Sequence, residues 1–375
     1  DTFRVVVFRR LSFTTEMAAA NAAACRSKLL ESVRSLWHSA MSRSIDPSQV
    51  GIILSGGVDT GAVLEALVEL KLLPGAALTV FVTPEATDLP YAAAMAEKHG
   101  LPHHAIHTTP DQLVSEALPD CVRALGCFDG MQLRNSMVVA LALKECRKLG
   151  LKYLFTGDAS DELMGGYSFT WGKDEPEWSQ ARDAMCADWF FSGPVLAEAQ
   201  GITAVSPYCN PIFKDWALTM KKDDCIGERD IETSPTSGRQ PWKTGKLPLR
   251  DAFPESLAAA RRKDPIEMGS GSTVLGKGFF QGKAPAPEGD RLWPEETAAR
   301  VVVRDEEHRV YFREFARQFP RVLEGVDVDT ADGACPPRRF GQPGSCIECG
   351  YVLYIPTADF CRTCGAYPAQ RPATT

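Results

Sequence analysis

A short apolar run that ends in a pair of glycines is the feature that most constrains the fold of this chain. Residues 50–55 are Val-Gly-Ile-Ile-Leu-Ser, and the length and composition of this run predict a buried strand. The following Gly-Gly-Val-Asp-Thr predicts a tight turn that leads into a helix over residues 60–71. Backbone N–H groups have no partner at a helix N-terminus, so this turn is suited to binding an anion.

Side chains in the same turn strengthen the case for an anion site. The hydroxyls of Ser55 and Thr60 are hydrogen-bond donors, and Asp59 is placed to hold a divalent cation beside a bound phosphate. The pattern is not of the Walker type, which ends its loop in Gly-Lys-Ser or Gly-Lys-Thr. A plain tight turn before a helix is the alternative, but the acid at position 59 favours a nucleotide site.

Predicted strands and helices alternate on both sides of this turn. Strands are expected over residues 77–83, 103–107 and 152–156, and helices over 88–99 and 132–149. Continuous apolar strands separated by helices are typical of a doubly wound parallel sheet, so we expect an α/β fold. In such folds the ligand lies at the carboxyl ends of the strands.

The rest of the chain predicts further segments and a division into domains. The expected segments are a strand over 3–8, an alanine-rich helix over 15–42, a mobile loop over 227–246, a linker over 281–291 and a helix over 294–318. We expect residues 1–49 to pack as a strand and a helix on a core domain over 50–280. A linker and helix over 281–332 then lead to a small module over 333–375.

Composition and charge exclude some classes of function. The 375 residues are 44% hydrophobic and 24% charged, as is usual for a soluble globular protein. The net charge of −7 argues against a dedicated nucleic-acid binder, and no apolar run approaches the roughly 18 residues of a membrane span. Most of the 12 cysteines are scattered through apolar stretches, which suits reduced thiols and predicts a cytoplasmic setting. The chain begins at Asp1 rather than Met, so any upstream targeting segment lies outside it.

A second turn, rich in acids, follows the strand predicted over residues 152–156. It contains Asp158, Asp161 and Glu162, and it ends in Gly-Gly-Tyr. Carboxylates so close together repel one another unless a cation or protons relieve them. At the end of a parallel strand that faces the first turn, Mg²⁺ bridging nucleotide phosphates would provide this relief. A solvated acidic helix N-terminus is the alternative for this turn taken alone.

The two turns together resemble the ATP-pyrophosphatase (PP-loop) domain of asparagine synthetases and of β-lactam synthetase. That family carries Ser-Gly-Gly-X-Asp-Ser in the first turn and Gly-(Glu/Asp)-Gly-(Ser/Ala)-Asp-Glu-X-Phe-Gly-Gly-Tyr in the second. This chain has Ser-Gly-Gly-Val-Asp-Thr at 55–60 and Gly-Asp-Ala-Ser-Asp-Glu-Leu-Met-Gly-Gly-Tyr at 157–167. The segments at 246–253 and 261–264 are similar to further family motifs, so the resemblance covers residues 50–280.

The resemblance implies that ATP activates a substrate carboxylate. The carboxylate attacks the α-phosphate, which gives an acyl-adenylate and pyrophosphate, and ammonia or an amine then forms the amide. The resemblance also implies which residues contact ATP and Mg²⁺: Ser55, Gly56, Gly57 and Thr60 for pyrophosphate, Asp59 and Asp161 for Mg²⁺, and Leu54, Val82, Thr156 and Gly157 for the adenine pocket. Lys263 would neutralise the α- and β-phosphates, although an exposed lysine in a basic run is its alternative. Asp158 would deprotonate the nitrogen nucleophile.

The chain departs from the family in two places. Glutamine-dependent members begin with a glutaminase domain that has an N-terminal cysteine nucleophile, and residues 1–49 do not resemble it. Ammonia or another amine is then the nucleophile, unless a separate glutaminase supplies ammonia or an N-terminal domain lies outside this chain. In the family's Glu-X-Arg-X-Pro-Phe-Leu-Asp segment, Thr203, Val205 and Asn210 replace the three charged residues, which argues against aspartate as the substrate.

Four cysteines near the C-terminus form a separate pattern. Cys346 and Cys349, and then Cys361 and Cys364, make two Cys-X-X-Cys knuckles, each followed by glycine. The spacing predicts a zinc ribbon in which four thiolates hold a structural Zn²⁺, with a strand expected over 351–355. A pair of disulfides is the alternative. The ribbon is expected to stabilise the domain or to contact a protein partner, and contact with nucleic acid is less favoured.

Two other functions use the same motifs. tRNA-thiolating enzymes also join a PP-loop domain to Cys-X-X-Cys zinc modules, but the acidic charge of this chain and its second turn favour the synthetase branch. A non-catalytic member that binds ATP or a protein is the third interpretation. The retained acids and Lys263 argue against that interpretation, and the changes over 203–210 argue for it. We therefore predict an ATP-dependent amide ligase that acts on a small-molecule carboxylate and on ammonia or an amine, with no membrane contact.

Overall fold

A parallel sheet of five strands forms the centre of the molecule. The structure, a computed structural model, describes residues 2–234, 236–276, 278–285 and 294–370. The strands are β1 (Val50–Ile53), β2 (Ala76–Phe81), β3 (His103–His107), β4 (Tyr153–Phe155) and β5 (Thr203–Val205). Their spatial order is β3-β2-β1-β4-β5, and all neighbours pair in parallel. The order runs outward from β1 in both directions, which confirms the doubly wound α/β fold.

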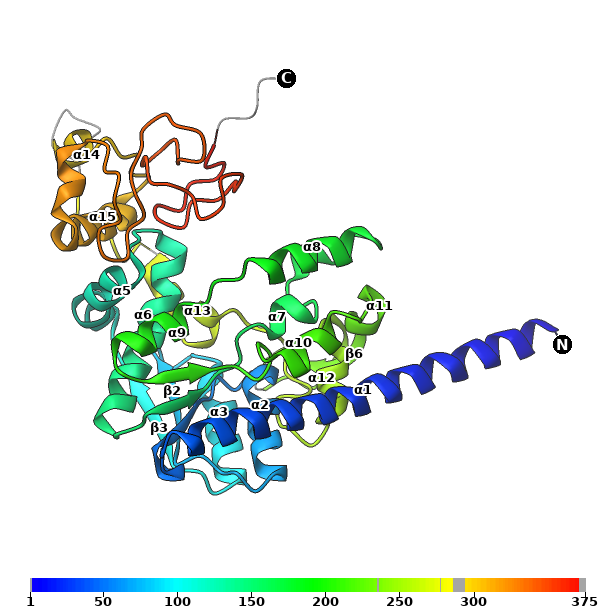
Figure 1. Cartoon of the computed structure of the whole chain (residues 1–375). Helices are drawn as coiled ribbons and strands as arrows, with labels where there is room; N and C mark the ends of the chain where they lie inside the picture. The colour runs from blue at the N-terminus through cyan, green and yellow to red at the C-terminus, as the bar shows by residue number, and fades with distance from the viewer. Residues whose placement is uncertain (1, 235, 277, 286–293, 371–375) are drawn as a thin grey trace.

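Helices cover both faces of the sheet, and each face has its own hydrophobic core (Figure 1). The first core is built with α1 (Thr2–Ser42), α2 (Val58–Glu69) and α3 (Asp88–Lys98). The second is built with α5 (Leu118–Leu125), α6 (Gly130–Lys148) and α9 (Ser192–Ala199). Because both faces are buried, the central strands are continuously apolar rather than alternating.

The remaining helices are short or lie in the second half of the chain. They are α4 (Pro110–Gln112), α7 (Ser160–Leu163), α8 (Glu177–Ala187), α10 (Pro211–Ala217), α11 (Lys222–Cys225), α12 (Leu247–Ala252), α13 (Ile266–Gly269), α14 (Pro294–Ala299) and α15 (Glu306–Gln318). Single turns of tighter or wider helix are η1 (Pro47–Gln49), η2 (Leu113–Ala117), η3 (Ser168–Thr170), η4 (Ser272–Gly276) and η5 (Pro320–Glu324). Among the described helices, none is both long enough and apolar enough to be a candidate membrane span.

The strand expected over residues 3–8 is wrong, because these residues belong to α1. The expected helix over 15–42 is present and continues toward the N-terminus. Within the described sheet the edges are β3 and β5, and neither pairs with the N-terminal segment. Extending an existing alanine-rich helix adds one hydrogen bond per residue, which outweighs the weak strand preference of valine and phenylalanine.

The mobile loop expected over residues 227–246 is also wrong. β6 (Gly227–Glu232) and β7 (Arg239–Thr244) pair there as an antiparallel hairpin. The turn-forming residues fall between the strands, and Ile231 is buried while its neighbour Asp230 is exposed. This alternation is the mark of a strand with one covered face, and the polar composition concealed it.

Two expectations for the C-terminal third are corrected as well. The single helix expected over 294–318 is two helices, because Arg300 has a φ of 53° and Asp305 caps α15 through its side chain, 2.8 Å from the N–H of His308. The strand expected over 351–355 is reduced to isolated bridges, since the knuckle turns take up the neighbouring backbone hydrogen bonds. Most of the expected linker over 281–291 lies outside the described residues.

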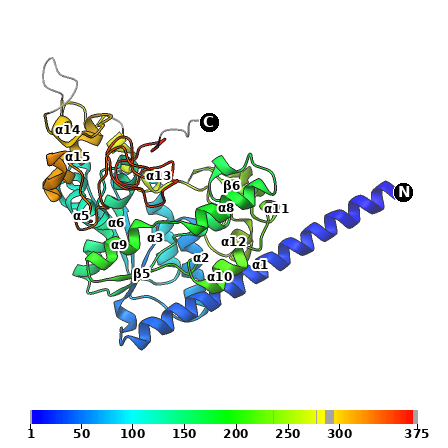
Figure 2. The same cartoon turned by 45° about the horizontal axis from the view of Figure 1, so that its top comes forward.

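The residues from 333 to 370, called the cysteine module below, pack on the rest of the molecule near α5 and α15 (Figures 1 and 2). The module has little regular secondary structure of its own. Its buried residues belong to the same hydrophobic core as α5, α6 and α15. The ring of Tyr351, for example, lies edge-on to Phe315 with centroids 5.8 Å apart. The cysteine module therefore shares a core with the α/β domain.

Candidate active site

The first glycine turn joins β1 to α2 as predicted. Gly56 has a φ of +72°, and a Cβ there would lie 2.6 Å from the carbonyl oxygen of Asp88. Ser55 Oγ lies 3.1 Å from Thr60 Oγ1, so the two hydroxyls share one side of the turn. Gly57 is the N-cap of the 12-residue α2 and makes no side-chain cap hydrogen bond. The start of α2 is thus suited to an anion through its backbone N–H groups.

The second turn folds back onto the first. Ser160 Oγ donates to Asp59 Oδ1 at 2.7 Å, which ties the start of α7 to the start of α2. Gly157 lies so close to α2 that a Cβ on it would be 2.9 Å from the Cβ of Asp59. Gly166, in the Gly-Gly-Tyr end of the turn, lies against the Asp161 carboxylate, where a Cβ would collide. The structure therefore brings the two motifs together, as the resemblance implies.

A buried lysine connects the acids of the two turns. Lys246 Nζ lies 2.7 Å from both carboxylate oxygens of Asp59 and 2.7 Å from Asp161 Oδ1, and its side chain is 1% exposed. The backbone of Lys246 has a φ of 62° just before α12, and its N–H donates to Met164 O at 2.9 Å. Lys263 Nζ lies 3.3 Å from Asp161 Oδ2 on the other side of the same acid. Two lysines and two aspartates thus form one ionic cluster.

The cluster favours the charged forms of Lys246 and Asp161. Burial favours the neutral amine of Lys246, but the carboxylates of Asp161 and Asp59 outweigh it and raise the pKa of this lysine. Burial likewise opposes ionisation of Asp161, yet Lys246 and Lys263 outweigh it and lower the pKa of this carboxyl. A carboxylate that is held ionised beside an anion-binding turn, as Asp161 is, can take either an ammonium group or a metal ion as its partner.

Asp158 differs from its neighbours because, among the residues that the structure describes, no cation contacts its carboxylate. Thr156 Oγ1 donates to Asp158 Oδ2 at 2.7 Å, and Ser206 Oγ donates to the Asp158 carbonyl at 2.6 Å. Burial is the main cause that raises the pKa of Asp158, and the negative charges of Asp59 and Asp161 add to it. A carboxylate with a raised pKa accepts a proton more readily than an ordinary aspartate.

An arginine that the sequence analysis did not select supports the first turn. Arg261 Nη1 donates to the Ser55 carbonyl at 3.1 Å, and its Nη2 lies 2.7 Å from Asp88 Oδ1 and 3.4 Å from Asp264 Oδ2. Burial raises the pKa of Asp88 to about 6, although Arg261 opposes this shift. Arg261 is 3% exposed and lies directly behind the glycine turn, so its charge adds to the positive potential there.

A cavity of about 540 Å³ contains most of the predicted site residues. Those that line it are Ser55, Gly57, Asp59, Thr60, Thr156, Gly157, Asp158, Asp161 and Lys263. Leu54, Gly56 and Val82 are not among its lining residues. Leu54 and Val82 are buried, one in each hydrophobic core, so their contact with adenine stays a prediction. The far wall comes from α6 and from residues 190–193.

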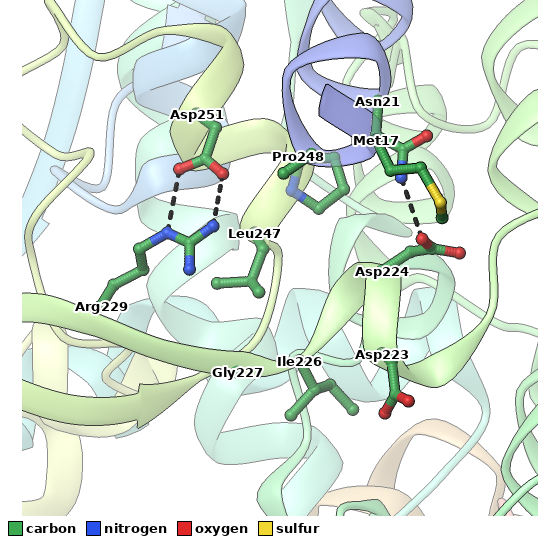
Figure 3. A pocket seen from close by; sticks show the side chains of 11 residues that line it. Met17, Asn21, Asp223, Asp224, Ile226, Gly227, Arg229, Leu247, Pro248 and Asp251 are labelled. Atoms are coloured by element: carbon green, nitrogen blue, oxygen red, sulfur yellow. Dashed lines mark hydrogen bonds and ion pairs between the residues drawn. The ribbon is translucent and has the colours of Figure 1, made fainter. Parts of the chain in front are cut away.

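A second cavity lies between α1, α11 and α12, and its lining contains no residue of the two turns (Figure 3). It measures about 320 Å³. Arg229 and Asp251 in its wall pair with each other through two hydrogen bonds of 3.2 and 2.7 Å, and Asn21 donates to Asp224 at 3.0 Å. Because these polar groups already satisfy one another, the larger cavity is the better candidate for an active site.

The four cysteines of the predicted zinc ribbon converge on one point. Their sulfur atoms all lie within 4.8 Å of one another, and the Cys346–Cys364 and Cys349–Cys361 pairs are 3.7 Å apart. This distance is far longer than the roughly 2.05 Å of a disulfide, so the disulfide alternative is not what the structure shows. Four thiolates around Zn²⁺ at about 2.3 Å are about 3.8 Å apart in a tetrahedron, which matches this arrangement.

Backbone geometry explains why each knuckle needs its glycine. Gly350 and Gly365 have φ values of +76° and +75°, which favour glycine. Their N–H groups donate to the carbonyls of Cys346 and Cys361, at 2.9 and 2.8 Å. The two knuckles thus repeat one turn geometry that directs both thiols of each pair inward, as the sequence predicts.

Part of the α/β domain is similar in sequence to known proteins. Residues 32–201 match the family model described as asparagine synthase. Asparagine synthetase (glutamine-hydrolyzing) of Asparagus officinalis is 30% identical over 196 residues, which cover 48% of this chain and 33% of that protein. Asparagine synthetase B (glutamine-hydrolyzing) of Escherichia coli (strain K12) is 30% identical over 86 residues, which cover 23% of this chain and 15% of that protein. The match therefore spans a third or less of the length of these relatives.

Solved structures show a weaker likeness. The structure of NMN synthetase from Francisella tularensis covers 81% of this chain and 97% of its own, with 12% identity and a TM-score of 0.34. A likeness of this degree carries no argument about the site. The family match covers residues 32–201, and both facing turns, with the motifs that resemble asparagine synthetases, lie within this stretch.

Proposed function

We propose that the chain is an ATP-dependent ligase that adenylates a substrate carboxylate, releases pyrophosphate and forms an amide with ammonia or an amine. The observation that carries the proposal is that Asp59 and Asp161, which line the cavity beside the glycine turn, converge on the buried Lys246. Attack at a nucleotide phosphate needs an anion-binding backbone, cations and acids that hold a metal ion in one place. The asparagine synthase match supports the same class of reaction.

The acids in the cavity fit a magnesium ion. Asp59 and Asp161 belong to different turns, yet oxygens of both lie 2.7 Å from the same nitrogen of Lys246. A position that two carboxylates share in this way suits a divalent cation with oxygen ligands. Bound Mg²⁺ would neutralise the charge that develops on departing pyrophosphate. Lys263, which lines the same cavity, would then face the phosphates, and the buried Lys246 would contact the same two carboxylates.

The glycine turn fits the triphosphate itself. A Cβ at Gly56 would collide with the Asp88 carbonyl, so only glycine fits at this position of the turn. The N–H groups at the start of α2 and the hydroxyls of Ser55 and Thr60 would donate to pyrophosphate oxygens. Arg261 would hold the turn in place from behind through its hydrogen bond to the Ser55 carbonyl.

Asp158 is the residue that we expect to accept a proton. Once the acyl-adenylate has formed, the attacking nitrogen must lose a proton as its bond to the acyl carbon forms. The Asp158 carboxylate lies in the cavity wall, and the pKa of its carboxyl is raised mainly by burial. Thr156 fixes one of its oxygens by donating a hydrogen bond, which leaves the other free to accept.

The far wall of the cavity indicates the kind of carboxylate. Met131, Val139 and Leu143 of α6 face the cavity together with Phe190 and Phe191. These side chains favour a carboxylate carried on an apolar body over a small, doubly charged one.

The three substituted positions of the 203–210 segment do not contribute to this preference. Thr203, Val205 and Asn210 are not among the residues that line the cavity, and Asn210 caps α10 instead by accepting from the N–H of Ile212 at 3.0 Å. The argument against aspartate therefore rests on the apolar wall rather than on those substitutions.

We also propose that the four cysteines hold a structural Zn²⁺. The sulfur spacing of 3.7 Å fits a tetrahedral site with no open position. Elemental analysis of the purified full chain should give one zinc per chain, and the Cys346→Ser variant should lose it. Zinc that stays bound in this variant would contradict the assignment.

The release of AMP and pyrophosphate tests the proposed function. ATP, Mg²⁺ and ammonia are supplied with a panel of carboxylates that includes aspartate and carboxylates of increasing apolar length. We expect AMP and pyrophosphate in equal amounts with a subset of the panel, and none in the Asp59→Ala variant. The matched control is Asp223→Ala, which removes an acid from the second cavity and should change nothing. Formation of ADP, or turnover only with RNA, would contradict the proposal.

A further inference from the structure

The second knuckle of the cysteine module touches the wall of the active-site cavity. Arg362 and Thr363 lie between Cys361 and Cys364, so a metal ion on these thiols fixes their backbone directly. The Thr363 carbonyl accepts a hydrogen bond of 2.6 Å from the N–H of Phe128, just before α6. Arg304, in front of α15, donates to the Cys364 carbonyl at 2.7 Å and so holds the knuckle from its other side.

Through Phe128 the knuckle reaches the first wall of the cavity. The next residue, Asp129, caps α6 by accepting from the N–H of Gln132 at 3.1 Å. Gly365 of the knuckle packs directly on the Asp129 carboxylate, where any Cβ would collide. The residues that follow this cap, Met131 and Gln132, line the cavity. The position of the α6 N-terminus therefore depends on the knuckle.

Through Arg362 the knuckle also reaches the second wall. The Arg362 guanidinium donates to the Asp188 carbonyl at 2.7 Å and lies 3.2 Å from its carboxylate. The same group lies over the rings of Phe190 and Tyr354, 5.1 and 3.5 Å from their centroids. The segment from 190 to 193 lines the cavity and ends beside Asp158, since a Cβ on Gly193 would be 3.5 Å from Asp158 Oδ2.

We propose that the metal-loaded knuckle is a clamp that positions both substrate-side walls of the cavity, with Arg362 as its positioning residue. The proposal rests on the proposed function, because the walls it positions are those that would contact the carboxylate. The part of the cavity that would bind ATP is built from other elements, namely the two turns and the segment that contains Lys246. Zinc occupancy would thus control carboxylate binding and leave nucleotide binding largely unchanged.

The physical basis is that the metal supplies the order of this region. The described part of the cysteine module contains isolated bridges and no helix or strand. Four metal–thiolate bonds replace the hydrogen-bond ladder that would otherwise fix its loops. Removing the ion should free the knuckle, and with it the hydrogen bonds to Phe128 and Asp188.

Amide hydrogen exchange on the full chain tests the clamp without requiring turnover. The Phe128 N–H donates to the knuckle, so the peptide over 126–131 reports on docking directly, and 188–194 reports on the second wall. Zinc removal by a chelator should raise exchange in both peptides by roughly tenfold, whereas the Arg362→Ala variant should raise it by a similar factor over 188–194 alone, because the Arg362 side chain contacts only the second wall. Exchange over 50–60, which contains β1 and the glycine turn, should stay unchanged.

The matched control is Arg339→Ala on the same module. Arg339 is 50% exposed and pairs with Asp329 at 3.5 Å, and the described contacts place it on neither wall. We expect wild-type exchange in this variant. In the AMP assay, Arg362→Ala should raise the KM for the carboxylate roughly tenfold and change that for ATP by less than about twofold.

Three results would overturn the clamp. The first is that amide exchange over 126–131 and 188–194 does not respond to zinc removal. The second is that exchange over 50–60 rises as much as exchange over those two peptides. The third is that Arg339→Ala changes exchange as Arg362→Ala does. Failure of the proposed function is distinct, because it would remove AMP formation and leave the zinc-dependent exchange pattern intact.

Discussion

Replacing Lys246 by methionine tests the ionic cluster at the centre of the site. The ammonium group is 1% exposed and lies 2.7 Å from carboxylates of both turns, while methionine keeps the length of the side chain and removes its charge. Asp59 and Asp161 would then face each other without their shared cation. Removing one partner of a buried ion pair costs about 3–5 kcal/mol.

The expected loss lies at the lower end of this range. Lys263 stays 3.3 Å from Asp161 and can partly compensate, so we expect a loss of about 3 kcal/mol in the free energy of unfolding. In a chain of this size each kcal/mol lowers Tm by about 2 °C, which gives a fall of roughly 6 °C. Differential scanning calorimetry of the full chain without nucleotide measures this quantity.

The loss should depend on pH in a defined direction. The pKa of Asp161 is lowered in the folded protein, so its contribution to stability is present above its ordinary value of 3.8 and disappears as pH falls through the lowered value. In Lys246→Met, protonation of Asp161 relieves the repulsion between the two acids. The gap in Tm between wild type and variant should therefore be largest near neutral pH and narrow as the pH approaches 4.

Two controls complete this test. Lys148→Met removes a lysine that is 73% exposed and pairs with Glu145 on the surface of α6, and it should change Tm by less than about 1 °C. The double variant Lys246→Met with Asp161→Asn removes one charge of each sign and should recover part of the lost stability. A wild-type Tm in Lys246→Met, or a deficit independent of pH, would refute the reasoning.

Three further predictions concern single residues of the site. Asp158→Asn should slow amide formation by about 100-fold while carboxylate-dependent exchange of pyrophosphate into ATP continues, and a loss of both steps would assign this residue to the first step. The pKa of Asp88 is raised from its ordinary value of 3.8 to about 6, so the free energy of unfolding should fall as pH rises between these two values. Denaturant titrations of Asp88→Asn should lack this dependence on pH. A dependence that persists in the variant would contradict the assignment to Asp88. Gly56→Ala should abolish ATP binding, measured by calorimetry, because the added Cβ would lie 2.6 Å from the Asp88 carbonyl oxygen. Gly100 also has a positive φ, +63°, but open space surrounds it, so the Gly100→Ala control should bind ATP normally. Equal ATP binding by the two variants would contradict the packing argument.

The elements that the sequence predicts correctly are those with a local physical cause. The run at 50–55 can only be a buried strand that ends in a turn, and the paired knuckles need left-handed glycines at Gly350 and Gly365. The second turn is predicted as a cation site because its closely spaced carboxylates would otherwise repel one another. Each of these signals lies within one short stretch of the sequence, so no knowledge of the tertiary structure is needed to detect it.

The features that escaped prediction depend on contacts between distant segments. Lys246 is far from Asp59 in sequence, and nothing around it indicates a buried ammonium group, although its segment matches a family motif. Arg261 is likewise far from Ser55 in sequence, although it donates a hydrogen bond to the Ser55 carbonyl. Residues 3–8 look like a strand locally, but α1 includes them because no sheet edge in the described structure pairs with them.

Tracing the oxygen atoms of the substrate tests the central claim most directly. If the substrate carboxylate attacks the α-phosphate of ATP, a carboxylate labelled with heavy oxygen must transfer one labelled atom to AMP when the amide forms. Mass spectrometry of AMP after turnover with ammonia should therefore show a single heavy oxygen, and the Asp59→Ala variant should show none. Label found in inorganic phosphate, or AMP that carries no label because its one new oxygen comes from water, would contradict adenylation of the carboxylate.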